Sequence, residues 1–100
     1  MVNLASVAIQ VLPLTENEQE LYRIVDEVIA YIKSFDLPTV VGPFETTVEG
    51  DYDTLLEIVK NVSPLALQAG AQNLLVNVKI AAANERSVQT IAQKTDRHQR

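Results

Sequence analysis

The feature that most constrains this sequence is the order in which two apolar periodicities follow one another. Two long segments, residues 15–35 and 51–70, repeat apolar residues every three or four positions, which is typical of amphipathic helices. Shorter segments, mostly alternating with a period of two, are typical of β-strands. We expect these strands at residues 4–12, 39–41, 44–49 and 73–82. The predicted order is therefore strand, helix, strand, strand, helix, strand.

This order predicts an α+β fold of the ferredoxin-like type. Two βαβ halves with right-handed crossovers give a four-stranded antiparallel sheet with both helices on one face. The chain has 100 residues, enough for one such domain. We place the domain at residues 1–84. Residues 85–100 are interpreted as a C-terminal extension, with a short helix at 87–94 and then a mobile basic tail.

Capping signals predict where the two helices begin and end. Thr15 and Glu18 have the spacing of a capping box at the start of the first helix, and residues 36–38 stop it near Phe35. Before the second helix, Gly50 is expected to form a turn and Asp51 to act as the N-cap. Two further signals concern the body and the end of the second helix. Pro64 should kink or split it, and Gly70 should cap its C-terminus.

The strand alternation leaves one face of the sheet without a covering layer. If the helices cover the face with Val7, Ile9, Val48, Val76 and Val78, the other face is open. The residues expected there are Ser6, Ala8, Gln10, Glu45, Thr47, Glu49, Leu75, Asn77 and Lys79. This mixture of polar and apolar side chains suits a partly wet subunit interface, or a ligand cleft closed by a second subunit.

The composition excludes several classes of function. A formal net charge of −5 argues against sequence-independent nucleic-acid binding, which depends on a basic surface. The absence of cysteine excludes disulfides and thiolate metal sites. No apolar stretch approaches the roughly 20 residues of a membrane span, and the N-terminus lacks a secretory signal. We therefore expect a cytoplasmic protein with no nucleic-acid or membrane partner.

The sequence contains no recognisable catalytic constellation. Its one histidine, His98, stands near the C-terminus among charged residues, and three glycines do not make a phosphate-binding loop. Asp51 and Asp53 are explained by helix capping rather than by a metal ion. An acylphosphatase has the same fold class, but its phosphate-binding arginine would follow the first strand, and Arg23 and Arg86 do not. We expect no enzyme activity, cofactor or metal.

The carboxylates of Glu45 and Glu49 are the most informative polar groups. They lie four residues apart on one strand, with Thr47 between them, so all three point to the open face. Half-buried carboxylates are costly unless they are paired. Pairing with Lys79, either within the chain or across a subunit interface, is one interpretation. Recognition of a cationic or amine-bearing small molecule is the other, and the two are compatible.

One run of residues resembles a known family. The run from Val41 to Asp51, which contains Thr46 followed by Glu49-Gly50-Asp51, is similar to the signature of the thiamine-binding (YkoF-like) family. The first strand with its closing Pro13, Ala69-Gly70-Ala71 and Val78-Lys79-Ile80 agree with the family pattern. The resemblance covers about residues 4–81. Where many members of the family have an acidic and a basic residue after the last strand, this chain has Ala81-Ala82-Ala83.

The resemblance implies a ferredoxin-like fold, self-association into dimers or tetramers, and binding of thiamine or its hydroxymethylpyrimidine part. It carries over Ser6, Thr46, Thr47 and Glu49 as ligand-binding candidates. A carboxylate and hydroxyls match the donors and acceptors of an aminopyrimidine, and an acidic pocket favours the cationic thiazolium. Phe44 and Tyr31 have rings that could stack on the ligand, but we expect both in the core.

Our leading hypothesis is a homo-oligomeric, non-catalytic protein that binds thiamine or a related pyrimidine. The alternative is a regulatory or assembly module whose open face joins subunits and binds no small ligand. The candidate ligand-binding residues are Ser6, Gln10, Glu45, Thr46, Thr47, Glu49, Asn77 and Lys79.

Overall fold

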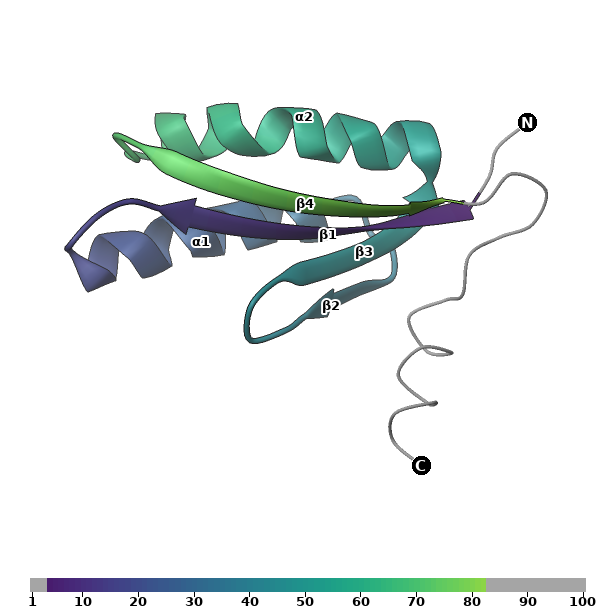
Figure 1. Ribbon diagram of the computed structural model, residues 1–100, viewed down its shortest axis with the longest axis horizontal. Helices are drawn as coiled ribbons and strands as arrows, with labels where there is room; N and C mark the ends of the chain where they lie inside the picture. The colour runs from purple at the N-terminus through teal and green to yellow at the C-terminus, as the bar shows by residue number, and fades with distance from the viewer. Residues whose placement is uncertain (1–3, 83–100) are drawn as a thin grey trace.

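The computed structural model describes residues 4–82 of the chain (Figure 1). Six elements follow one another in the predicted order: β1 Leu4–Pro13, α1 Glu18–Lys33, β2 Thr39–Val41, β3 Thr46–Asp51, α2 Tyr52–Gln68 and β4 Leu74–Ala82. Over this range no helix combines the length and the apolar character that crossing a membrane requires. The C-terminal extension predicted at 85–100, with its helix at 87–94, lies outside the described residues, as do Arg86 and His98.

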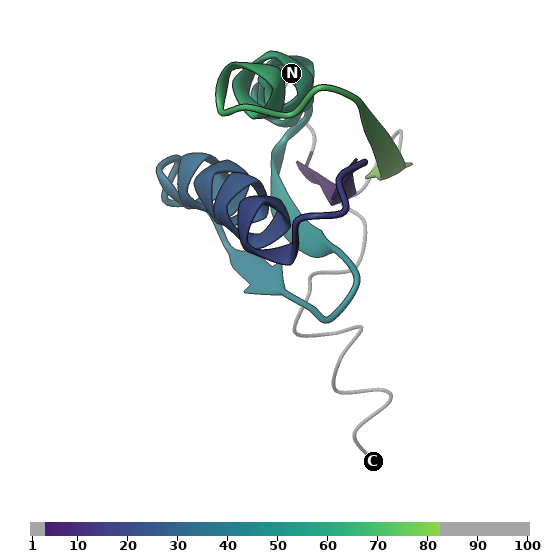
Figure 2. The same ribbon diagram turned by 90° about the vertical axis from the view of Figure 1, so that its left-hand side faces the viewer.

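The four strands form one antiparallel sheet in the order β2-β3-β1-β4. β1 is central and pairs with both β3 and β4, whereas β2 pairs with β3 at the edge. Figure 2 shows α1 and α2 together on one side of the sheet. The arrangement is the ferredoxin-like α+β fold, so the predicted fold class is confirmed.

The hydrophobic core lies between the two helices and the sheet face beneath them. Val7, Ile9 and Val48 supply the sheet side, as the alternation predicted. The helices supply Ile24, Val28, Ile32, Leu55, Ile58, Val62 and Ala66. Each fully buried aliphatic side chain of this size contributes about 1.5–3 kcal/mol relative to an exposed one. This burial holds the helices against one face and leaves the other face to solvent.

The predicted capping box at the start of α1 is wrong. The helix begins three residues later than Thr15, and Asn17 is its N-cap: the Asn17 side chain accepts a hydrogen bond of 3.1 Å from the Glu20 amide. Thr15 Oγ1 instead accepts from the Asn17 amide at 3.1 Å. Asn is at least as good an N-cap as Thr, and the Asn17 side chain lies three residues before Glu20, where its oxygen satisfies a free helix amide. The helix ends at Lys33, and Asp36 turns the chain with a φ of 55°.

The boundaries of α2 follow the sequence signals more closely. Asp51 is the N-cap, and its carboxylate accepts hydrogen bonds from the Thr54 amide at 3.3 Å and from the Thr54 hydroxyl. Pro64 lies inside the helix without splitting it. Gly70 follows the C-cap residue with a φ of 126°. The Gly70 and Ala71 amides donate back to carbonyls of the last turn, which closes the helix in a Schellman motif.

The expected turn at Gly50 is not found, because β3 begins and ends two residues later than predicted. Gly50 lies inside β3, is buried, and pairs with Ala5 of β1. A Cβ atom at this position would lie 3.0 Å from Leu37 Cδ1. The missing side chain therefore gives Leu37 room to pack against the sheet, and α2 begins directly after the strand.

Candidate functional site

Seven of the eight candidate residues belong to the face of the sheet that neither helix covers. The register places six of them on this face: Ser6 lies beside Glu49, Thr47 and Lys79 lie on either side of Ala8, and Gln10 lies beside Asn77. Glu45, in the loop before β3, joins this face through its ion pair with Lys79. Directly paired residues of antiparallel strands point to the same side. The predicted open face is therefore a real surface of the fold, with polar groups drawn from β1, β3, β4 and the loop before β3.

Two side-chain contacts order polar groups on this open face. Asn77 Nδ2 donates a hydrogen bond of 3.0 Å to Gln10 Oε1. Lys79 Nζ lies 3.4 Å from Glu45 Oε2, so the intramolecular pairing predicted between these two residues is present. The Lys79 side chain is 77% exposed and that of Glu45 is 33% exposed. The ion pair is thus a surface contact that solvent or a ligand can replace.

A shallow concavity of about 320 Å³ lies on the same face. Its lining includes Ser6, Glu45, Thr47 and Lys79 among the predicted candidates. Ala8 and Ala81 line it as well, and sequence reasoning did not propose either as a ligand contact. The strand alternation could have identified both residues, because it places Ala8 and Ala81 on the open face. Their methyl groups leave space between the longer polar side chains.

Ser6 and Glu49 lie at one end of this face. Ser6 is buried, although no helix covers it, because its small side chain stands on the central strand between Glu49 and Ala81. Glu49 is half-buried, and its backbone amide donates to the Pro38 carbonyl at 3.0 Å. Glu49 does not line the concavity, but it lies beside Ser6, which does.

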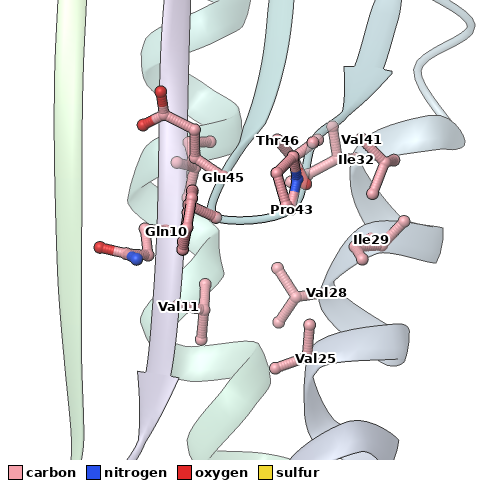
Figure 3. A pocket seen from close by; sticks show the side chains of 13 residues that line it. Gln10, Val11, Val25, Val28, Ile29, Ile32, Val41, Pro43, Glu45 and Thr46 are labelled. Carbon is pink, nitrogen blue, oxygen red and sulfur yellow. The ribbon is translucent and has the colours of Figure 1, made fainter.

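Thr46 points to the opposite face of the sheet from the other strand candidates, although it lines a cavity together with Gln10 and Glu45. Thr46 pairs with Ile9 and points to the covered face, where it is buried. There it lines a smaller cavity of about 100 Å³ between α1 and the sheet. Figure 3 shows Val11, Val25, Val28 and Ile29 around this cavity, with the Gln10 amide and the Glu45 carboxylate pointing away from it. Apart from Thr46, Gln10 and Glu45, the lining of this pocket is apolar.

Tyr31 and Phe44 were both predicted to lie in the core, and only Tyr31 does. Tyr31 packs against the core, and its hydroxyl accepts a hydrogen bond of 3.0 Å from Asn61 Nδ2. The core prediction for Phe44 is wrong, since this residue is 79% exposed. Phe44 lies in the loop between β2 and β3, where Gly42 donates to the Glu45 carbonyl, so strand alternation does not apply to it.

Asp51 and Arg23, which the sequence analysis considered for metal and phosphate binding, make other contacts in the structure. Within residues 4–82, no group of three or more carboxylate or imidazole side chains is placed to hold a metal ion. Asp51 serves as the N-cap of α2. Arg23 lies on α1, where it contacts Glu20 and the Ala69 carbonyl oxygen. The open face combines carboxylates, two hydroxyls, amides and one ammonium, which are suited to a polar organic ligand.

The strand order and the two helices on one face define a ferredoxin-like α+β domain with an open polar face. The family model described as "Thiamine-binding protein" matches residues 7–99. A UPF0045 protein from Clostridium perfringens is 45% identical over 75 residues, which are 75% of this chain and 78% of that protein. The chain belongs to the thiamine-binding protein family, which confirms the resemblance noted in the sequence.

Solved structures agree with this assignment. A protein from Streptococcus pneumoniae is 36% identical, with both chains covered completely and a TM-score of 0.75. A protein from Thermotoga maritima, provisionally named for thiamine biosynthesis or salvage, is 27% identical and has a TM-score of 0.83. That match covers 95% of this chain and 98% of the other. The fold and family are thus established together.

Proposed function

We propose that this chain is a non-catalytic, homo-oligomeric protein of the cytoplasm that binds thiamine or its hydroxymethylpyrimidine part on the open face of the sheet. The observation that carries the proposal is the concavity in which Ser6, Glu45, Thr47 and Lys79 meet. Membership of the thiamine-binding family and the likeness to the Thermotoga maritima protein support the choice of ligand.

The groups around the concavity match the polar parts of the proposed ligand. An aminopyrimidine presents both donors and acceptors, which the Glu45 carboxylate and the Thr47 hydroxyl can satisfy. The thiazolium carries a positive charge that a carboxylate stabilises. Glu49, next to Ser6, adds a second negative charge to the same face. The ligand is therefore bound by hydrogen bonds and charge rather than by apolar enclosure.

A second copy of the chain is the proposed cover for this face. The concavity is open to solvent, whereas small-molecule sites usually bury most of the ligand surface. Val40 and Leu75, which share the open face by strand register, are 46% and 53% exposed. Exposed apolar side chains beside polar groups are suited to a subunit contact, because protein interfaces combine both kinds of surface. Light scattering on the purified protein measures whether it is a dimer or tetramer.

Isothermal titration with thiamine and, separately, with hydroxymethylpyrimidine tests the ligand assignment. Saturable binding in the micromolar range, a free energy of about −8 kcal/mol, is the expected result. Glu45→Gln and Glu49→Gln should each weaken binding by roughly 10- to 100-fold, since a hydrogen bond to a charged group contributes about 1.5–3 kcal/mol. Glu57→Gln, at an exposed position on α2, removes the same charge away from the face and serves as the matched control.

Two outcomes separate loss of the site from loss of the fold. Circular dichroism should show unchanged secondary structure and melting temperature in the variants. If a folded, oligomeric protein gives no heat with either ligand, the ligand assignment is wrong. Unchanged affinity in both site variants would place the ligand elsewhere, with the Thr46 cavity as the next location to test by Thr46→Val.

The alternative function, an assembly module without a small ligand, is favoured by the same exposed Val40 and Leu75 side chains. In that case the polar groups of the open face set the register between subunits. Thermal melts across a library of small molecules distinguish the two functions. A ligand that binds the folded state raises the melting temperature, whereas a pure interface responds only to protein concentration.

A further inference from the structure

Lys79 has a distinctive place among the charged residues of the fold. Within residues 4–82 it is the one cationic side chain carried by the sheet, since Arg23, Lys33 and Lys60 lie on the helices. Its ammonium reaches across β1 toward Glu45, in the loop before β3. Both side chains line the concavity, and Ala8 of β1, the neighbour of Lys79 in the sheet, lies between them. The ion pair therefore bridges the concavity at the place where the Glu45 carboxylate faces solvent.

The pair has the geometry of a weak and replaceable contact. Lys79 Nζ lies 3.4 Å from one Glu45 oxygen and 3.5 Å from the other, and the lysine side chain is 77% exposed. Pairs this exposed shift an equilibrium by about two- to fivefold at most. Lys79 also has a flexible four-carbon stem, so it can leave Glu45 without moving the backbone.

We propose that Lys79 is a specificity-determining residue: its ammonium occupies the position on Glu45 that a ligand's cation would take, and it is displaced when a cationic ligand binds. This inference rests on the proposed function, because it concerns the same concavity. A cationic ligand must compete with Lys79 for Glu45 and is then repelled by the released ammonium nearby. A neutral ligand that forms hydrogen bonds elsewhere on the face neither competes with Lys79 for Glu45 nor is repelled by its ammonium. Lys79 thus selects against weakly held organic cations, which lack other contacts to offset the competition.

The variant Lys79→Gln tests the inference directly. It removes the competing charge and keeps a polar side chain of similar length. Lys60→Gln, at an exposed position on α2, changes the net charge equally and is the matched control. Three probes are titrated by calorimetry: thiamine, neutral hydroxymethylpyrimidine, and an N-alkyl thiazolium salt that lacks the pyrimidine.

The expected result is a gain confined to the cationic probes. Lys79→Gln should bind thiamine and the thiazolium salt roughly three- to fivefold more tightly than the wild-type protein and the Lys60→Gln control. Its affinity for hydroxymethylpyrimidine should stay within about twofold of the wild-type value. Adding Glu45→Gln to Lys79→Gln should abolish the gain, because the carboxylate for which the cations compete is then absent.

The failure of this inference and the failure of the proposed function give different patterns. If thiamine or hydroxymethylpyrimidine binds but Lys79→Gln leaves cation affinity unchanged or weaker, the proposed function stands and the inference is overturned. A weaker affinity would show that Lys79 orients Glu45 instead of competing for it. If the variant gains affinity only for the thiazolium salt and neither thiamine nor the pyrimidine binds, the inference stands and the proposed ligand is wrong. Absence of binding by all three probes to both proteins overturns both.

Discussion

Arg23 of α1 donates a hydrogen bond of 2.5 Å to the carbonyl oxygen of Ala69, the C-cap residue of α2. The same Nη2 atom lies 2.6 Å from Glu20 Oε2, so a carboxylate holds the guanidinium against the end of the second helix. The carbonyls at a helix C-terminus lack partners within the helix, and a cation there also complements the helix dipole. One side chain therefore joins two helices whose contacting residues are 46 positions apart.

Removing this link should destabilise the fold without affecting the open face. Arg23→Gln is expected to lower the melting temperature by roughly 2–6 °C, a range typical of losing one modest interaction in a domain of this size. Lys60→Gln, which removes an exposed cation from α2, is the control and should lower the melting temperature by less. Differential scanning calorimetry measures both. Equal effects of the two variants would show that net charge, rather than the Ala69 contact, is responsible.

The Glu20–Arg23 contact should also appear in the acid stability of the protein. The hydrogen bond from Arg23 lowers the pKa of the Glu20 carboxyl below its ordinary value of 4.5. The unfolded chain then binds this proton more tightly than the folded one does, so the stabilisation is fully present above pH 4.5. It is lost as the pH falls through the lower pKa of the folded state.

Glu20→Gln should therefore make the decline of stability below pH 4.5 shallower, as measured by urea unfolding at a series of pH values. Glu57→Gln provides the matched loss of an exposed carboxylate on α2. If both variants reduce the loss of stability at low pH equally, the overall charge explains the effect and the Arg23 contact does not.

Asp51 should act in stability as a helix cap. Asp51→Ala removes the acceptor for the Thr54 amide and is expected to cost about 0.5–2 kcal/mol in the free energy of unfolding. Asp51→Asn keeps an acceptor oxygen and should recover most of that loss. Denaturant titration of the two variants gives the comparison. A large loss in ligand affinity with Asp51→Asn, at unchanged stability, would instead assign Asp51 to the binding site.

Phe44 should be dispensable for folding despite its size. Its side chain is 79% exposed, so Phe44→Ser is expected to change the free energy of unfolding by less than about 0.5 kcal/mol. Ile58→Ala, at a position with 0% exposure, should cost about 2–5 kcal/mol. A loss of several kcal/mol in Phe44→Ser would mean that the ring packs against another subunit, and the loss should then depend on protein concentration.

Errors in the sequence predictions fall where several local signals compete. At the start of α1, Thr15 and Asn17 are both good N-caps, and the structure selects Asn17. Gly50 was read as a turn because glycine often breaks strands, yet it lies in β3 where Leu37 needs the space of its missing side chain. At Asn17 the deciding contact is the local hydrogen bond from the Glu20 amide, whereas at Gly50 it is the packing of Leu37 against the sheet.

The sequence by itself determined the order of the elements and the face to which each strand residue points, because side-chain alternation is a local property of an extended backbone. It therefore predicted the fold class and the open face on which seven of the candidate residues lie. Pairing of a carboxylate with Lys79 was one interpretation of the sequence, but only the tertiary structure showed that Glu45 makes this contact within the chain. Glu45 and Lys79 are 34 positions apart, and Arg23 reaches Ala69 across 46. Such contacts depend on strand register and helix placement, which are fixed by the packing of the whole core and not by the residues near any one position.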